Sequence, residues 1–360
     1  MELKGIRYFK NNKLCFGNIS LGRCIEEITP IDAYDENSPI LIPSYIDLHC
    51  HGGFGYDIMT CNSNMLCEFG EKLLSVGTGI YMPTLVGAEF DMLEKLVEQL
   101  ALAKEMHTGA EIAGVHIEGT FISKKKCGII NEKYIYSPDI RLVDRLLKYN
   151  LKLRFTVAPE TDGALDFIEY AVKKGCMVSL GHSVADNKIT NMALSRGADL
   201  ITHIFNAMPA LNHREPNLLS TALTRPVFCE VICDTYHISK EILKLIYMLK
   251  GRDKGIIVSD SISAMGLDEG KYSFCNKEIF VSGGKATDIN GTLAGSICNI
   301  HTGVLNMLRS ANVTIEEILP WAITNPAKVL NIENHIISEG KSPSMLLLDN
   351  NYNIKQIITF

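Results

Sequence analysis

The middle of the chain alternates apolar, strand-like runs with helix-like segments, and this alternation limits the possible folds more than any other feature. Helix-like segments at 90–107, 165–174, 185–196 and 239–250 each follow such a run. Eight buried strands alternating with helices favour a parallel (β/α)8 barrel of the TIM type over a doubly wound sheet. The eight runs begin at Ile42, Gly79, Ile112, Leu153, Met177, Leu200, Phe228 and Gly255.

The two ends of the chain differ from this middle, because both are rich in short strand-like segments and lack a helical period. Both termini are therefore expected to form one small β-sandwich domain. The predicted division is 1–42 and 334–360 for this domain and 43–333 for a metal-dependent hydrolase barrel. Residues 270–293 interrupt the barrel rhythm and predict an inserted hairpin that turns at Gly283-Gly284.

The charge and cysteine content exclude several classes of partner. The net charge is −6 without a block of like charge, so neither a nucleic acid nor a membrane surface is expected as a partner. No apolar run is long enough to span a bilayer, and the start of the chain lacks the apolar core of a signal peptide. Eleven scattered cysteines, in a chain of this length, predict a reducing, cytoplasmic location.

Polar motifs follow the predicted strands at the points where the strands end. A barrel presents the carboxyl ends of its strands at one mouth, so these side chains should converge. Seven of the ten histidines lie in these motifs or just after the sixth strand, a concentration that random placement does not produce. The motifs are Asp47-Leu48-His49-Cys50-His51, His116-Ile117-Glu118-Gly119, Gly181-His182-Ser183, Thr202-His203-Ile204-Phe205-Asn206, Asp234-Thr235-Tyr236-His237 and Ser259-Asp260.

Five of these groups form a plausible set of ligands for divalent metal ions. Glu118, His182 and His203 suit one catalytic ion with an open coordination position. His49 and His51 are two residues apart on a strand and so face the same way, which suits a second ion bridged by Glu118. One or two ions per subunit are expected, with zinc favoured and iron, manganese or cobalt as alternatives. The competing interpretation, hydrogen-bonded core histidines, suits one lone histidine better than this cluster.

Asp260 closes the eighth predicted strand and is the candidate general base. A carboxylate at the barrel mouth can accept the proton of a water that a metal activates. The alternative interpretations of Asp260 are a helix N-cap and an ordinary salt-bridge partner.

The order and content of these motifs resemble those of a known family, the N-acetylglucosamine-6-phosphate deacetylases of the amidohydrolase superfamily. The resemblance covers roughly residues 43–330. The Asp-x-His-x-His pattern that begins at Asp47 and the last Asp are shared across the superfamily, whereas Phe205-Asn206-Ala207-Met208 and His213-Arg214-Glu215-Pro216 are more specific. No strand carries an evident position for a carbamylated lysine, which argues against hydantoinase-like relatives.

The resemblance implies roles for individual residues. The ligands and the acid/base residue are those named above. Asn206 and Ala207 resemble the loop that holds the sugar phosphate, and His237 resembles a contact to the sugar or acyl oxygen. Arg214, with His213, resembles a phosphate-binding group that reaches in from the neighbouring subunit of a homodimer with shared active sites. His116 is also expected to contact the substrate. The implied reaction releases acetate from N-acetyl-D-glucosamine 6-phosphate, a small amino-sugar phosphate.

Several positions depart from the family pattern, so the motifs do not determine which sugar is the substrate. The departures most relevant to the substrate are Thr120, Ile130, Thr235 and Asn217, where the family usually has Pro, His, Gly and Gly. The alternatives are a deacetylase of the galactosamine epimer, a catalytically silent sugar-phosphate-binding protein and a cyclic amidase. The alternative role of Arg214 is a surface ion pair with Glu215.

Overall fold

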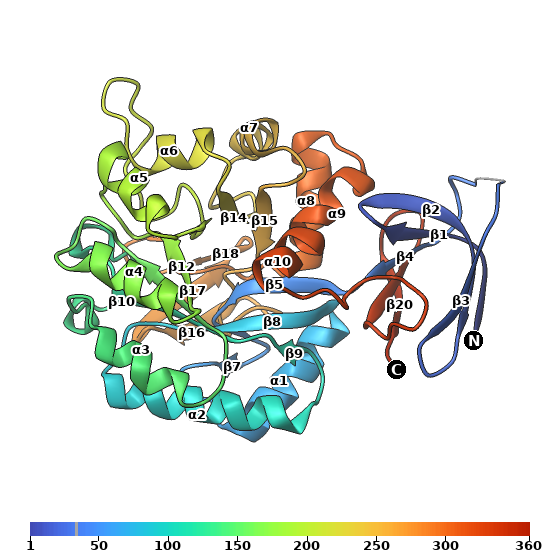
Figure 1. Ribbon diagram of the computed structural model, residues 1–360, viewed down its shortest axis with the longest axis horizontal. Coiled ribbons are helices and arrows are strands. Elements are labelled where there is room, and N and C mark those ends of the chain that lie inside the picture. Colours follow the sequence, from blue (N-terminus) through green and yellow to red (C-terminus); the bar gives the residue numbers. More distant parts are fainter. Residues whose placement is uncertain (33–34) are drawn as a thin grey trace.

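The computed structural model describes residues 1–32 and 35–360, and its centre is a closed barrel of eight parallel strands (Figure 1). Residues after the last strand close the barrel against the first, since Cys50 and Ser261 form a parallel bridge and Asp260 N donates to His49 O at 2.8 Å. This architecture confirms the predicted (β/α)8 barrel. The strands are β5 (Tyr45–Cys50), β8 (Thr78–Leu85), β10 (Val115–Phe121), β11 (Leu153–Val157), β12 (Met177–Leu180), β13 (Leu200–Ile201), β14 (Phe228–Ile232) and β15 (Gly255–Val258).

Helices surround this barrel and cover its outer face (Figure 1). Helix α2 shows why they form, because Leu93, Leu96, Val97 and Leu100 recur at helical spacing and are buried. Within the described residues, no helix is both long enough and apolar enough to cross a membrane. The helices are α1 (Ser63–Ser75), α2 (Phe90–Met106), α3 (Ile140–Leu147), α4 (Ala164–Lys173), α5 (Asn187–Ser195), α6 (Leu218–Thr224), α7 (Lys240–Lys250), α8 (Ile300–Ala311), α9 (Ile315–Ala322) and α10 (Thr324–Val329), with 3-10 turns η1 (Lys124–Lys126) and η2 (Glu132–Tyr134).

Two predicted strand starts need correction. The first barrel strand begins at Tyr45, because Ile42 belongs to β4 (Ile40–Pro43) of a different sheet. The third begins at Val115, because Ile112 lies in the short β9 (Glu111–Ile112), which pairs with β8. In both places one apolar run contains two buried segments, and hydrophobicity alone does not separate them.

The terminal strands form a separate six-stranded sheet, as predicted, with the order β20-β19-β4-β1-β2-β3. The two chain ends lie on this sheet, on one side of the barrel (Figure 1). Its own core includes Ile19, Ile25, Leu41 and Met345. The residue boundaries of the two domains stay a prediction. The further strands are β1 (Glu2–Lys10), β2 (Lys13–Leu21), β3 (Ile25–Pro30), β19 (Met345–Leu348) and β20 (Ile354–Ile358).

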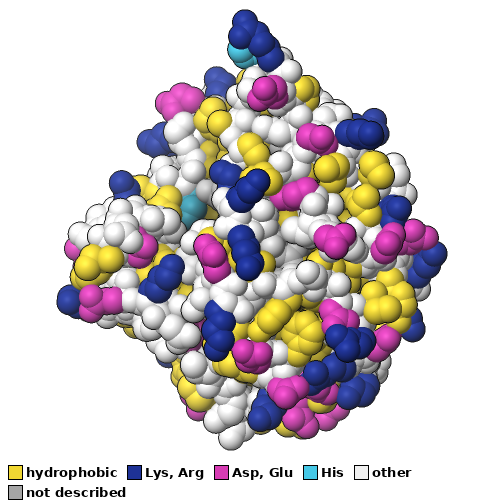
Figure 2. Space-filling view, turned by 90° about the vertical axis from the view of Figure 1, so that its left-hand side faces the viewer, with side chains coloured by type: hydrophobic (Ala, Val, Ile, Leu, Met, Phe, Trp, Pro, Cys, Tyr) yellow, Lys and Arg dark blue, Asp and Glu magenta, His cyan; other side chains and the backbone are white. Residues whose placement is uncertain are grey.

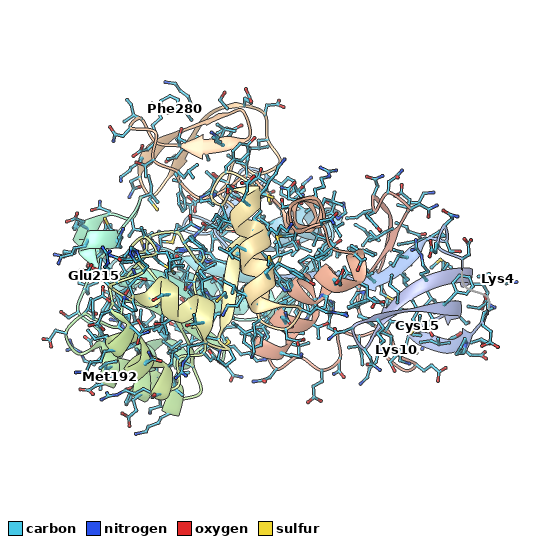
Figure 3. The ribbon with its side chains drawn as sticks, turned by 90° about the horizontal axis from the view of Figure 1, so that it is seen from above. Lys4, Lys10, Cys15, Met192, Glu215 and Phe280 are labelled. Carbon is cyan, nitrogen blue, oxygen red and sulfur yellow. The ribbon has the colours of Figure 1, made fainter. Side chains whose placement is uncertain are left out.

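The insertion after β15 is a three-stranded antiparallel sheet and so contains one strand more than the predicted hairpin. Its strands are β16 (Gly270–Phe274), β17 (Lys277–Ser282) and β18 (Lys285–Thr287), and the predicted Gly283-Gly284 turn joins the last two. Figure 3, in which Phe280 is labelled, shows this sheet standing out from the barrel. Its apolar residues pack on Val86 and Ile129 at the barrel mouth, so the insertion forms a wall beside the site described below. A short hairpin of β6 (Gly52–Gly53) and β7 (Tyr56–Asp57) follows β5.

Candidate metal centre and active site

The carboxyl ends of the barrel strands bring the six predicted metal-binding and catalytic side chains together. Each of these residues is buried, with less than a tenth of its surface exposed. Because they come from positions between 49 and 260, only the closed barrel makes them neighbours. They are His49 and His51 at the end of β5, Glu118 on β10, and His182, His203 and Asp260 just after β12, β13 and β15.

One carboxylate oxygen of Glu118 faces two imidazoles. Glu118 Oε1 lies 2.9 Å from His203 Nε2 and 3.3 Å from His182 Nε2. The two imidazole nitrogens are themselves 3.0 Å apart. Three potential ligand atoms that converge in this way form a group that could hold a metal ion.

The other oxygen of Glu118 faces His49 and His51, at the end of β5. Glu118 Oε2 lies 3.4 Å from His49 Nε2 and 3.3 Å from His51 Nε2, and these nitrogens are 3.2 Å apart. This second group could also hold a metal ion. Glu118 therefore stands between two potential sites and offers one oxygen to each, which is the arrangement of a bridging carboxylate.

Asp260 adjoins the second group, that of His49, His51 and Glu118, and it lines the pocket described below. Its Oδ1 lies 3.2 Å from His51 Nε2 and 3.4 Å from His49 Nε2. No helix begins at Asp260 in the described structure, so the helix N-cap interpretation is wrong. The carboxylate can thus reach both the potential ligand atoms and the pocket, the position that a general base requires.

The backbone is strained at three of these residues. His182, His203 and Asp260 have φ values of 48°, 25° and 48°, in the left-handed region that L residues rarely adopt. Each such residue costs about 1–3 kcal/mol, and such strain concentrates at functional sites. Successive side chains of an extended strand point to alternate sides. The sharp turns at these three residues instead direct their side chains toward the cluster.

The electrostatics of the cluster suit a cation. Burial raises the pKa of Glu118, but the charge of His49 and hydrogen bonds from His182 and His203 outweigh it and hold that pKa well below its ordinary value. Burial lowers the pKa of His51, but hydrogen bonds to Asp260 and Glu118 outweigh it and raise that pKa to about 9. The carboxylates are therefore ionised, and a divalent ion bound by the same imidazole nitrogens would release their protons.

Hydrogen bonds on the far side of the rings fix their orientation. His182 Nδ1 donates to the Lys126 carbonyl at 2.7 Å, and His51 Nδ1 donates to the Thr84 carbonyl at 3.1 Å. A proton held on Nδ1 leaves the Nε2 lone pair free to face the cluster. The rings are thus prepared as ligands through Nε2, which supports a metal site over the competing core-histidine interpretation.

A pocket of about 410 Å³ opens over this cluster, within the usual size range for small-molecule sites. The predicted Asn206, Ala207 and His237 line it, as does Ile130. Asp234 orients His237, since its Oδ2 accepts from His237 Nδ1 at 2.7 Å. Apolar side chains also line it, among them Val86, Ile129 and Phe274 of the inserted sheet.

His213 and Arg214 lie apart from this pocket, on a loop between β13 and α6 that projects from the barrel (Figure 1). Both are exposed, and the projection at the top of Figure 2 carries basic, acidic and histidine side chains. Among the described residues no carboxylate lies within 4.0 Å of the Arg214 guanidinium, and Glu215 instead accepts from Asn212 Nδ2 at 3.2 Å. The ion pair with Glu215 is therefore absent, and the phosphate role stays a prediction.

His116 needs correction, because the structure places it beneath the cluster. It is fully buried, and its ring nitrogens contact Thr156 Oγ1 at 2.7 Å and Thr84 Oγ1 at 3.2 Å. Its ring packs edge-on against His49 at 4.7 Å between centroids. Both ring nitrogens are used within the protein, so the predicted substrate contact is wrong, and His116 instead packs beneath the candidate ligand His49.

Sequence reasoning missed two buried charged residues beneath the cluster. Arg154 on β11 and Glu230 on β14 are both fully buried and form an ion pair at 2.5 Å. The signal was present, since each is a charged residue within an otherwise apolar strand, Leu153–Val157 or Phe228–Ile232. A charge at such a position is almost never buried unless it is paired.

The departures from the family pattern have separate structural consequences. Thr235 has φ of 67°, which explains why glycine is usual there. Asn217 caps α6 and also donates from Nδ2 to the Ala210 carbonyl at 2.8 Å, so it anchors the base of the projecting loop. The Thr120 hydroxyl is buried without a described hydrogen-bond partner.

Comparison with known proteins agrees with this geometry. No model of a protein family matches the chain. The chain is 31% identical to the N-acetylglucosamine-6-phosphate deacetylase of Bacillus subtilis, over 86% of this chain and 80% of that protein. It is 28% identical to the N-acetylgalactosamine-6-phosphate deacetylase of Escherichia coli O157:H7, over 92% and 89%.

A solved structure shares the whole fold. The N-acetylglucosamine-6-phosphate deacetylase of Thermotoga maritima superposes with a TM-score of 0.92 at 27% identity, over 100% of this chain and 98% of that one. The identity to the Bacillus subtilis enzyme, the coverage and the common fold together confirm the resemblance seen in the motifs. This chain belongs to the N-acetylglucosamine-6-phosphate deacetylase family of the amidohydrolase superfamily.

Proposed function

We propose that this protein hydrolyses the amide bond of N-acetyl-D-glucosamine 6-phosphate to D-glucosamine 6-phosphate and acetate. The proposal is carried by one arrangement: Glu118 offers one oxygen to each of two histidine pairs, and Asp260 faces the same pocket. The family relationship supplies the substrate class.

The residues of the chain divide the chemistry between them. Glu118, His182 and His203 would hold one divalent ion, and His49 and His51 with Glu118 would hold a second. Bound there, such an ion would polarise the amide carbonyl and acidify water. Asp260 accepts a proton from the attacking water at its carboxylate. It then returns that proton to the amide nitrogen, because an amine leaves only when it is protonated.

Substrate binding would use the residues around the pocket. His237, held by Asp234, would contact the sugar or acyl oxygen. Asn206 and Ala207 would hold the phosphate with Arg214 and His213 of a second subunit, in a homodimer with shared sites. Guanidinium groups suit phosphate because they donate bidentately. The exposed Arg214 guanidinium, which has no carboxylate partner among the described residues, supports this arrangement.

The metal and the compartment form part of the same proposal. We propose zinc, since the donor set of imidazoles and a carboxylate is one that zinc favours, although iron, manganese and cobalt bind the same ligands. We also propose a cytoplasmic location, because all eleven cysteines are free thiols.

The test measures acetate release by the purified protein with each divalent metal. The substrates are the 6-phosphates of N-acetylglucosamine and N-acetylgalactosamine, together with unphosphorylated N-acetylglucosamine. Asp260→Asn protein is the control. The proposal expects the highest kcat/KM for the glucosamine phosphate and a large loss without phosphate. Preference for the galactosamine epimer would favour the alternative that the Escherichia coli relative suggests. Binding without acetate release would favour a silent binding protein.

A further inference from the structure

Glu230 lies directly beneath the proposed metal centre. It sits on β14, and its side chain is fully buried. Its neighbours Cys229 and Val231 pack outward against the helices, whereas Ile232 belongs to the apolar interior of the barrel. Because side chains alternate along a strand, Glu230 points into that interior. A carboxylate there loses its hydration and needs compensating partners.

The carboxylate contacts both halves of the proposed metal centre, one formed by His49 and His51 and the other by Glu118, His182 and His203. Its Oε2 lies 3.2 Å from His49 Nδ1. The same oxygen accepts a hydrogen bond from the backbone N–H of His203 at 3.3 Å. Thus one oxygen reaches the side chain of a ligand on one half but only the backbone of a ligand on the other.

The contact with His49 fixes the chemical form of that ring. A carboxylate oxygen accepts the Nδ1 proton, so the lone pair of the neutral ring, the form that binds a metal, is on Nε2. His49 Nε2 is the atom that faces Glu118 Oε2 at 3.4 Å and His51 Nε2 at 3.2 Å. A ligating histidine that donates its other N–H to a carboxylate is held in one orientation and becomes a better donor.

Arg154 holds the carboxylate in place. Its guanidinium forms an ion pair with Glu230 Oε1 at 2.5 Å, and it donates hydrogen bonds to the Leu48 carbonyl at 3.1 Å and to Ser179 Oγ at 3.2 Å. Leu48 directly precedes His49, so the arginine joins the strand of the ligand to the strand of the carboxylate. Its positive charge compensates the buried carboxylate of Glu230.

We propose that Glu230, held by Arg154, is a positioning residue that sets the His49 ring for the second divalent ion. The affinity of the His49–His51 half then depends on this carboxylate. The affinity of the half formed by Glu118, His182 and His203 depends on it much less. This inference rests on the metal-binding part of the proposed function and is independent of the substrate.

The test is a metal titration of metal-free protein with Zn²⁺ against a chromogenic chelator, which yields the two dissociation constants without any activity assay. We expect Glu230→Gln to weaken the second constant about 10- to 100-fold and to change the first less than about threefold. Val231→Ala, on the same strand but facing outward, is the matched control for general loosening and should leave both constants near those of the wild type.

A second variant covers the case in which Glu230→Gln does not fold. Replacing both partners, Arg154→Met with Glu230→Met, removes the buried charges together, a change that proteins often tolerate. It should reproduce the selective loss. Equal weakening of both constants, unchanged constants, or a wild type that binds a single ion would each overturn the proposal. A selective loss in a protein that releases no acetate would leave the positioning role intact and refute the proposed function instead.

Discussion

The barrel mouth and the projecting loop differ in how completely each satisfies its own polar groups. At the mouth, the imidazoles and carboxylates are buried and in contact with one another. On the loop, His213 and Arg214 are exposed, and the guanidinium has no ionic partner among the described residues. The difference supports our proposal that one chain contains the groups for hydrolysis, whereas a second chain contributes to phosphate binding.

At the barrel mouth, Asp260→Asn should have the largest effect on activity. The amide of asparagine cannot accept the water proton, so we expect kcat to fall about 10²- to 10⁴-fold. Metal content should stay at the wild-type value, as measured by elemental analysis of the same sample. If turnover survived, Asp260 would not be the base and the mouth would lack its catalytic group.

Arg214→Ala tests the loop and should have the next largest effect. Losing charge-assisted bonds to phosphate, about 1.5–3 kcal/mol, lowers kcat/KM about 10- to 100-fold. The loss should appear for the phosphorylated substrate and vanish for unphosphorylated N-acetylglucosamine.

A mixture of the two variants tests whether the loop of one subunit serves the site of the other. If Arg214 serves the partner subunit's site, a heterodimer of Arg214→Ala and Asp260→Asn chains contains one site with both groups intact. Activity should therefore return in confirmed heterodimers. Its failure to return would mean that each chain supplies its own phosphate ligand.

Ile130→His tests whether this apolar position in the pocket distinguishes one sugar epimer from the other. Ile130 is buried, lines the pocket and has no hydrogen-bonding side chain. A restored hydrogen bond is worth about 0.5–1.5 kcal/mol, so the ratio of kcat/KM for the glucosamine and galactosamine substrates should rise by up to about tenfold. An unchanged ratio would show that this position does not contribute to epimer choice.

Thr235→Gly should have the smallest effect. The half-buried Thr235 is strained at φ of 67°. Relief of this strain, less the entropy that glycine adds to the unfolded chain, should raise the free energy of unfolding by about 0.5–1 kcal/mol. Urea unfolding measures it, and Thr235→Ala, which keeps the strained backbone, should show no such gain. A gain in both variants would assign the effect to lost side-chain contacts.

Much of the fold could be predicted because it follows from local patterns. Helix α2 carries its apolar residues at helical spacing, and the strands are continuous apolar runs. The error at Ile42 has the same origin, since the buried runs of β4 and β5 are nearly continuous in sequence. Which sheet a buried strand joins depends on long-range pairing, which a local pattern does not contain.

The sequence alone determined the barrel, the separate terminal sheet, and the residues that gather at the mouth, because strand ends and histidine spacing are local properties. Only the tertiary structure decided how Glu118 divides its oxygens, that His116 supports His49 from below, and that Glu230 holds His49 from 181 residues away. The physical reason is barrel closure. It brings distant strand interiors within hydrogen-bond distance, and those contacts depend on register and side-chain direction in three dimensions.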